Sequence, residues 1–128
     1  MTNTSDLARQ YIETVGAGDL SPLDSLLHAD LVATVGDDTF DKAGWLQGLR
    51  RLLPALVRNE IRQVFSNGED AVVVYDFVTD TSAGAVPCVE LVTARDGAIT
   101  RIQLIFERLH WPEVLAALQQ SRATLSQK

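Results

Sequence analysis

The sequence predicts an α+β domain in which amphipathic helices come first and a meander of β-strands follows. Three observations lead to this class. Apolar residues recur at helical spacing between residues 7 and 56, they alternate or run on continuously after residue 60, and Asn-Gly and Asp-Gly pairs separate two pairs of the later segments. The first pattern is typical of helices packed on a core, and the other two are typical of antiparallel hairpins.

The first helix is predicted from an apolar stripe and a glycine stop. The stripe consists of Leu7, Ala8, Tyr11, Ile12 and Val15. Gly16 and Gly18 follow it, and residues without a Cβ commonly end a helix. Ser21 is the expected cap of a short second helix, with Pro22 in its first position, and a strand is expected over residues 31–35.

Asp41 is expected to cap a third helix, and Pro54 marks its weakened end. Its apolar side chains are Trp45, Leu46, Leu49, Leu53 and Leu56. The later apolar patterns predict strands over residues 60–65, 71–79, 85–94 and 99–107. A last helix is expected over residues 111–120, followed by a frayed tail.

Length and composition restrict the class of protein. With 128 residues we expect a single domain over 1–128, with a core over about residues 5–120. A net charge of −6 argues against nucleic-acid binding. No apolar run reaches membrane-spanning length and residues 1–10 have no hydrophobic signal core, so we expect no membrane partner and a cytoplasmic protein. Cys88 is the only cysteine, and His28 and His110 have no third ligand at a recognisable spacing, so no metal or other cofactor is expected.

The first elements carry a family resemblance. The run Arg9–Leu20, with its Gly-Ala-Gly-Asp-Leu end, and the run Ser21–Asp30 resemble the opening of the SnoaL-like and ketosteroid isomerase-like proteins. The Asp-Gly hairpin followed by Phe106 resembles the last two strands of that family, a branch of the nuclear transport factor two-like superfamily. The resemblance covers about residues 8–106. It implies a cystatin-like cone, in which a curved antiparallel sheet wraps around N-terminal helices and encloses a pocket for small molecules.

Strand alternation assigns faces if the bulkier apolar rows point toward the helices. On this rule the pocket is lined by Tyr11, Val15, Val35, Trp45, Leu49, Tyr75, Phe77, Val89, Leu91, Leu104 and Phe106. Simple core packing is the alternative for any one of these residues. The two tyrosines favour a pocket, because a buried hydroxyl needs a hydrogen-bond partner.

The sequence departs from the catalytic patterns that the resemblance implies. Alignment through Gly18-Asp19-Leu20 places the helix tyrosine of ketosteroid isomerases on Tyr11, but their proton-shuttling acid falls on Val35 and their protonated acid on Val89, give or take a residue. Valine cannot carry a proton. The last-strand acid of limonene epoxide hydrolase-like members falls on Leu104, and the central strand has no arginine. Neither reaction is therefore expected.

Tyr11 and Asp76 remain as weak catalytic candidates. Asp76 is a single acid in a run of valines, and a buried carboxylate can serve as a general base. Alternation places it on the outer sheet face, where pairing with Arg62 or Arg101 across a subunit interface is the favoured alternative.

The same outer face predicts a homodimer, because its apolar residues form a patch too large to leave in water. The residues assigned to this face are Val72, Val74, Val78 and Val92, with Asp76, Glu90, Arg101 and Gln103 between them.

The predicted function is the binding of an apolar small molecule in a pocket polarised by Tyr11 and Tyr75. Any chemistry would be isomerisation, cyclisation or hydration of a polyketide-like or terpenoid-like compound, as the resemblance implies. The alternative is a non-catalytic ligand-binding or dimerisation module. An open cavity that touches an acid favours catalysis, and a filled or purely aliphatic cone favours the alternative. Replacement of Tyr11 by phenylalanine is expected to weaken binding and to leave the melting temperature nearly unchanged.

Overall fold

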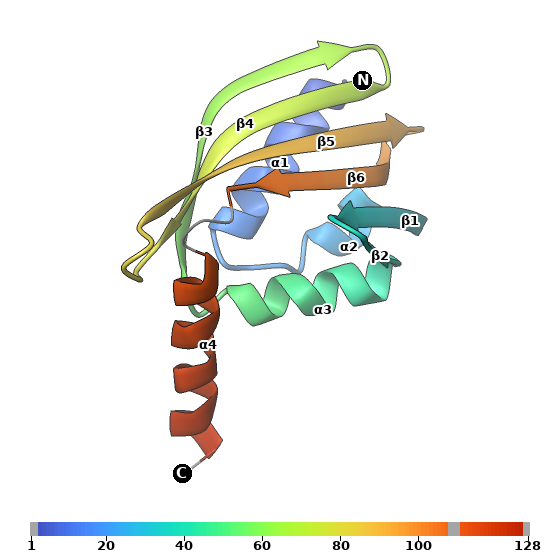
Figure 1. Cartoon of the computed structure of the whole chain (residues 1–128). Coiled ribbons are helices and arrows are strands. Elements are labelled where there is room, and N and C mark those ends of the chain that lie inside the picture. Colours follow the sequence, from blue (N-terminus) through green and yellow to red (C-terminus); the bar gives the residue numbers. More distant parts are fainter. Residues whose placement is uncertain (1–2, 108–110, 127–128) are drawn as a thin grey trace.

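Six strands form one curved sheet in the order β2-β1-β6-β5-β4-β3 (Figure 1). The computed structural model describes residues 3–107 and 111–126. The strands are β1 (Leu27–Val35), β2 (Asp38–Phe40), β3 (Leu56–Asn67), β4 (Asp70–Thr79), β5 (Ala85–Arg95) and β6 (Ala98–Phe106). The helices are α1 (Thr4–Gly16), α2 (Leu23–Leu26), α3 (Lys42–Leu52) and α4 (Trp111–Ser126).

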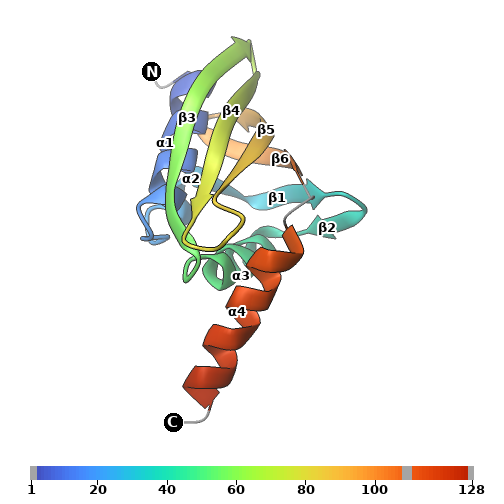
Figure 2. The same cartoon turned by 60° about the vertical axis from the view of Figure 1, so that its left-hand side comes forward.

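The helices occupy different places around the sheet. Figure 1 shows α1 against the concave face and α3 running across the open end of the curve. Figure 2 shows α4 leaving the body of the molecule. The expected α+β cone around N-terminal helices is therefore confirmed.

Side-chain caps begin the two longer N-terminal helices. The Asn3 side chain accepts from the Asp6 amide at 2.8 Å, and the Asp41 side chain accepts from the Gly44 amide at 2.8 Å, as predicted for Asp41. The short helix differs from the prediction. It begins at Leu23, and the Ser21 hydroxyl donates to Asp19 at 2.8 Å instead of capping.

The predicted hairpins are present. Asp96 and Gly97, with φ of 52° and 80°, connect β5 to β6, and Gly68, with φ of 67°, connects β3 to β4. Left-handed residues suit the twist of two-residue hairpins, which explains Asp96-Gly97 in one loop and Gly68, followed by Glu69, in the other. The last helix was expected to end near Gln120, but it continues to Ser126.

The first strand is longer than predicted and has an unpredicted neighbour. It begins at Leu27, pairs with β2 through Ala33↔Phe40, and pairs in parallel with β6 through Val35↔Leu104. The other strand pairs of the sheet are antiparallel. This parallel pairing brings the N-terminal third of the chain against its last strand.

Strand faces agree with the prediction on β4 and β6 but not on β5. The register Val73↔Glu90↔Leu104 places Glu90 on the inner face, where it is 2% exposed. Val92 is buried on the same face, whereas Val89 and Leu91 lie on the outer face. Their assignment to the pocket was wrong. The bulk rule failed because the inner row of β5 contains a carboxylate, which sequence reasoning places outside.

Candidate active site

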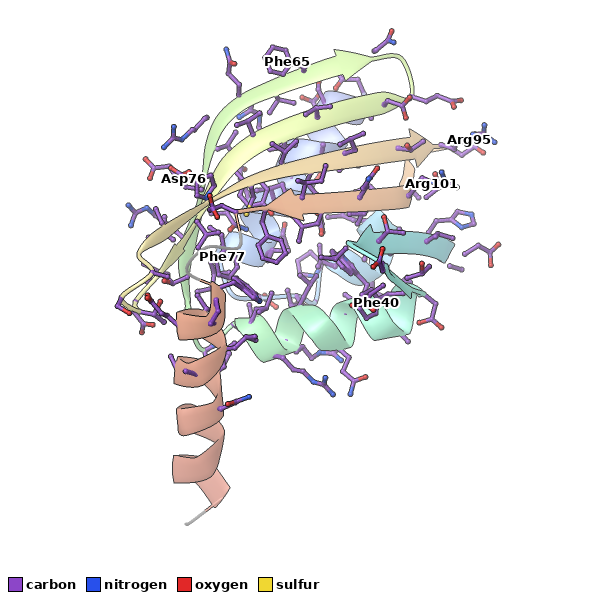
Figure 3. All side chains as sticks on the ribbon, viewed as in Figure 1. Phe40, Phe65, Asp76, Phe77, Arg95 and Arg101 are labelled. Carbon is purple, nitrogen blue, oxygen red and sulfur yellow. The ribbon has the colours of Figure 1, made fainter. Side chains whose placement is uncertain are left out.

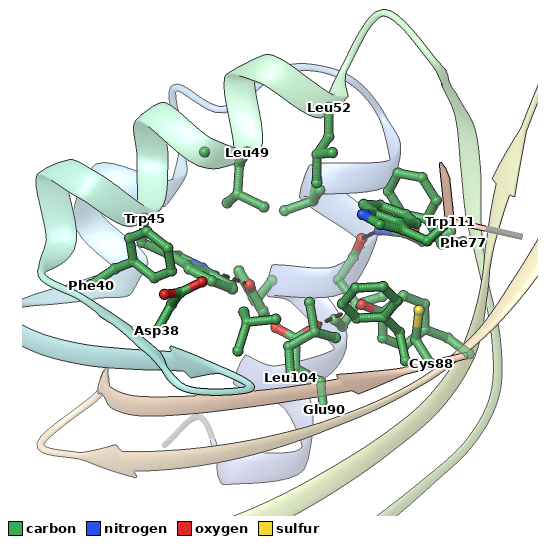
Figure 4. Close-up of a pocket in the computed structure, with 18 of the residues that line it drawn as sticks. Asp38, Phe40, Trp45, Leu49, Leu52, Phe77, Cys88, Glu90, Leu104 and Trp111 are labelled. Atoms are coloured by element: carbon green, nitrogen blue, oxygen red, sulfur yellow. Dashed lines mark hydrogen bonds between the residues drawn. The ribbon is translucent and has the colours of Figure 1, made fainter. Parts of the chain in front are cut away.

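A cavity of about 330 Å³ lies between the inner face of the sheet, α1 and α3 (Figure 4). Nine of the predicted pocket residues line it, namely Tyr11, Val15, Val35, Trp45, Leu49, Tyr75, Phe77, Leu104 and Phe106. Ten further lining residues were not predicted, and four of them carry polar or ionisable groups: Asp38, Asn59, Cys88 and Glu90. The volume falls within the range of small-molecule sites, roughly 300–1,000 Å³.

Two tyrosines, a tryptophan and a glutamate form the polar part of the cavity. The Tyr75 hydroxyl donates to Glu90 Oε1 at 2.6 Å. Trp45 Nε1–H donates to the Tyr11 hydroxyl at 3.0 Å, so the Tyr11 proton is directed elsewhere. Glu90 Oε2 is buried and accepts no hydrogen bond from the described residues, although the Tyr11 hydroxyl is near enough to interact with the carboxyl group.

Burial controls the protonation of these groups. It raises the pKa of Glu90 from 4.5 to about 7, and the hydroxyls of Tyr11 and Tyr75 limit the rise. Burial, followed by the charge of Glu90, raises the pKa of both tyrosines well above 10.0. Near neutral pH the site holds two phenol protons and a carboxyl group close to its midpoint. Such a group can donate a hydrogen bond when protonated and accept a proton when ionised.

The sequence matches the family model of the SnoaL-like domain over residues 8–102. The chain belongs to the SnoaL-like family. No curated protein matches the sequence. The SnoaL-like chain does resemble solved structures, and at the identities found this likeness concerns the fold.

Three solved structures illustrate the likeness. A protein from Kribbella flavida DSM 17836 superposes with a TM-score of 0.81 at 21% identity, covering 94% of this chain and 99% of that one. A steroid delta-isomerase from Pseudomonas aeruginosa gives 0.74 at 14% identity, covering 98% and 95%. A candidate polyketide cyclase from Sinorhizobium meliloti gives 0.70 at 18% identity, covering 78% and 94%.

The two acids that line this SnoaL-like cavity were not predicted from the sequence. The prediction that Val89 lines the pocket and Glu90 lies outside was wrong, because Glu90 lines the cavity and Val89 does not. Asp38 is a second acid that lines the cavity, and Figure 4 shows it beside Phe40, away from the Cys88 end. One signal could have found Glu90: two buried tyrosine hydroxyls need an acceptor.

The opposite end of the SnoaL-like cavity is aromatic. The rings of Phe106 and Trp111 lie 4.6 Å apart, and those of Phe77 and Trp111 lie 6.2 Å apart with an edge-on tilt. Nearby, burial raises the pKa of the Cys88 thiol to about 12, so this cysteine remains a neutral thiol. This end supplies apolar contact and no charge.

The second weak candidate, Asp76, lies on the outer face as predicted (Figure 3). Arg62, one of its two predicted arginine partners, donates to it from the same chain at 2.6 and 2.9 Å. Its side chain is 9% exposed while that of Arg62 is 65% exposed. The Asp76 carboxylate therefore has its ion-pair partner outside the cavity.

The described residues contain no group of three His, Cys, Asp or Glu side chains placed to hold a metal ion, and His110 lies outside them. The His28 ring accepts a hydrogen bond from the Asp30 amide at 2.9 Å. None of the helices within the described ranges is both long and apolar enough to cross a membrane.

Proposed function

We propose that the cavity binds an apolar molecule bearing a carbonyl group and catalyses a proton transfer on it. The observation that carries this proposal is the buried Glu90 carboxyl group, with a pKa of about 7, in the wall of an apolar cavity beside Tyr11 and Tyr75. A group with a pKa near the working pH is suited to acid–base catalysis.

The residues divide into two roles. Tyr11 O–H and protonated Glu90 would donate hydrogen bonds to the carbonyl oxygen, where negative charge develops when an adjacent C–H bond breaks. The Asp38 carboxylate would take the proton, leaving its electron pair in the enolate. Return of that proton to another carbon gives an isomer, so the step needs no oxidant or further reactant.

Two considerations favour catalysis over the non-catalytic alternative. Two acids, Asp38 and Glu90, line the cavity, and an open cavity that touches an acid favours catalysis. The cavity is neither filled nor purely aliphatic. The names of two structural neighbours, a steroid delta-isomerase and a candidate polyketide cyclase, are compatible with a carbonyl-bearing polycyclic substrate.

A β,γ-unsaturated polycyclic ketone, 17β-hydroxyandrost-5-en-3-one, tests the proposal, because its conjugated isomer is followed by absorbance. We expect turnover by the natural chain and a loss of about 10²–10⁴-fold in kcat for Asp38→Asn, the range for removing a positioned general base. The neighbouring exposed Asp37 provides a matched control, Asp37→Asn, with unchanged kcat. Binding without turnover would support the non-catalytic alternative.

Gly48 offers a test of whether ligands occupy this cavity. It lines the cavity from α3, and a Cβ added there meets no atom within 4 Å. We expect Gly48→Leu to fill the space and to weaken the binding of 17β-hydroxyandrost-4-en-3-one at least 10-fold, measured by calorimetry. Its unfolding free energy should stay level or rise, since glycine costs a helix interior about 1 kcal/mol. Unchanged probe affinity would mean that ligands bind elsewhere.

We further propose that the chain forms a homodimer through the outer sheet face. Two adjacent cross-strand rows there are mostly apolar, Phe65-Val72-Leu91 and Val74-Val89-Ile105. Phe65, Leu91 and Ile105 are 55%, 39% and 53% exposed. Figure 3 shows Phe65 projecting outward from β3. The outer patch predicted from the sequence also contained Val92 and Glu90, but both side chains lie on the inner face of the sheet.

Ile105→Arg tests the dimer. Because Ile105 is half exposed, arginine costs the monomer little, but two charges would meet near the two-fold axis of a self-complementary interface. We expect a monomer in sedimentation at concentrations where the natural chain is dimeric. Leu115→Arg on α4, at a position 44% exposed, is the matched control and should stay dimeric. A dimer that survives Ile105→Arg places the interface elsewhere.

A further inference from the structure

Asn59 on β3 lines the cavity and has one unused hydrogen-bonding atom. Its Nδ2 donates to the Ile12 carbonyl oxygen at 3.0 Å. Its Oδ1 is buried and has no partner among the described residues. A buried acceptor without a donor is unfavourable, so this atom is a place where a hydrogen-bond donor of a ligand would be stabilising.

The Asn59 amide has a fixed orientation. Rotation by half a turn would place Oδ1 against the Ile12 carbonyl, where two acceptors repel. Helix α1 also lies close to this point of β3, because a Cβ on Gly16 would come within 2.7 Å of the Asn59 backbone nitrogen. The absence of a side chain at Gly16 allows α1 to approach the backbone of Asn59 this closely.

Asn59 and Glu90 lie at different ends of the inner face. Asn59 pairs with Phe77 on β4, whereas Glu90 pairs with Val73 on the same strand. Four residues along a strand correspond to about 13 Å. Between these two levels the cavity wall is formed by Tyr75 and Cys88. The cavity therefore has donors and an acid at one end and a pure acceptor at the other.

We infer that the ligand is bifunctional, with a carbonyl oxygen at Tyr11 and Glu90 and a hydroxyl or amine group that donates to Asn59 Oδ1. The inference rests on the proposed function of the same cavity and adds a requirement on the far end of the substrate. A molecule that presents only an acceptor there leaves two acceptors facing each other. Asn59 is thus a specificity-determining residue.

Three rigid probes that differ at one position test the inference on the natural chain. They are 17β-hydroxyandrost-4-en-3-one, its 17-deoxy analogue and its 17-ketone. We expect the hydroxyl compound to bind 5-fold to 100-fold more tightly than either of the others in calorimetry. Equal affinities would overturn the inference while leaving the proposed function intact, and would fit a water molecule on Oδ1. If none of the probes binds, both fall.

The variant Asn59→Leu separates recognition from packing. Loss of the acceptor should bring the affinity ratio of the hydroxyl and deoxy probes close to one, with the deoxy probe bound at least as well as before. A merely structural role would weaken both probes together and keep their ratio. Gln63→Leu, an exposed position on the same strand, is the control and should keep the natural ratio.

Discussion

Glu90→Gln should remove a fall in stability that the natural chain shows between pH 4.5 and about 7. The folded state raises the pKa of Glu90, so it binds the proton more tightly than the unfolded chain does. Stability is therefore complete below pH 4.5 and declines until the pH passes about 7. The shift corresponds to about 3 kcal/mol. Glutamine is neutral throughout and accepts the Tyr75 hydrogen bond with its own oxygen.

Urea unfolding of both proteins across this window gives the difference curve. We expect Glu90→Gln to gain stability over the natural chain as the pH rises, and to reach its full advantage above about pH 7. Activity should follow the same group, because ionised Glu90 cannot donate to a carbonyl oxygen. The natural chain should lose kcat above about pH 7 and the variant should not show that step. Parallel stability curves would mean that Glu90 is not buried as described. Glu13→Gln, on the exposed side of α1, controls for the loss of one carboxylate.

Tyr11→Phe should weaken ligand binding and also lower stability. The change removes the donor to the ligand oxygen, for a loss of about 1–3 kcal/mol in binding free energy. It also leaves Trp45 Nε1–H buried without its acceptor, which costs about 1–3 kcal/mol of unfolding free energy. The expectation of an unchanged melting temperature changes for this reason, since the Trp45 hydrogen bond was not predicted from the sequence.

A double-mutant cycle separates the two effects. Trp45→Phe removes the donor, so the double variant with Tyr11→Phe has no orphaned group at that position. We expect its loss of stability to be smaller than the sum of the two single losses. Probe affinity should remain low in the double variant, because the ligand donor is still missing. Additive stability losses would show that the Trp45–Tyr11 bond contributes little.

Local signals in the sequence were sufficient for most of the fold. The two hairpin turns need left-handed residues, which Asp96, Gly97 and Gly68 supply, and the Asp41 cap satisfies a free amide of α3, so both follow from chemistry within a few residues. The rows of β4 and β6 were assigned correctly because their large apolar side chains alternate clearly. The cytoplasmic location and the single-domain extent stay predictions from composition and length.

The site was less predictable because it breaks the rules used to find it. Glu90 lies inside the cone, where burial disfavours its ionised form and the tyrosine hydroxyls only partly offset this effect. A rule that places charged residues on the outer face therefore assigns the two faces of β5 wrongly. Asp38 belongs to a strand too short to leave a pattern, and β2 becomes visible only through its pairing with β1. Such local conflicts between sequence rules and structure are expected at functional sites.

The parallel pairing of β1 with β6 has a consequence for the order of assembly on the ribosome. Strand β1 ends at Val35, yet its sheet partner is not synthesised until residues 98–106. Contacts of such high sequence separation form late and slow folding. Until then the emerging chain has α1, α3 and a β1 that can pair only with β2, and no closed cone. An apolar ligand can therefore find a formed cavity only after β6 has been synthesised. A nascent chain halted before β6 should expose the apolar lining of the cavity to chaperones.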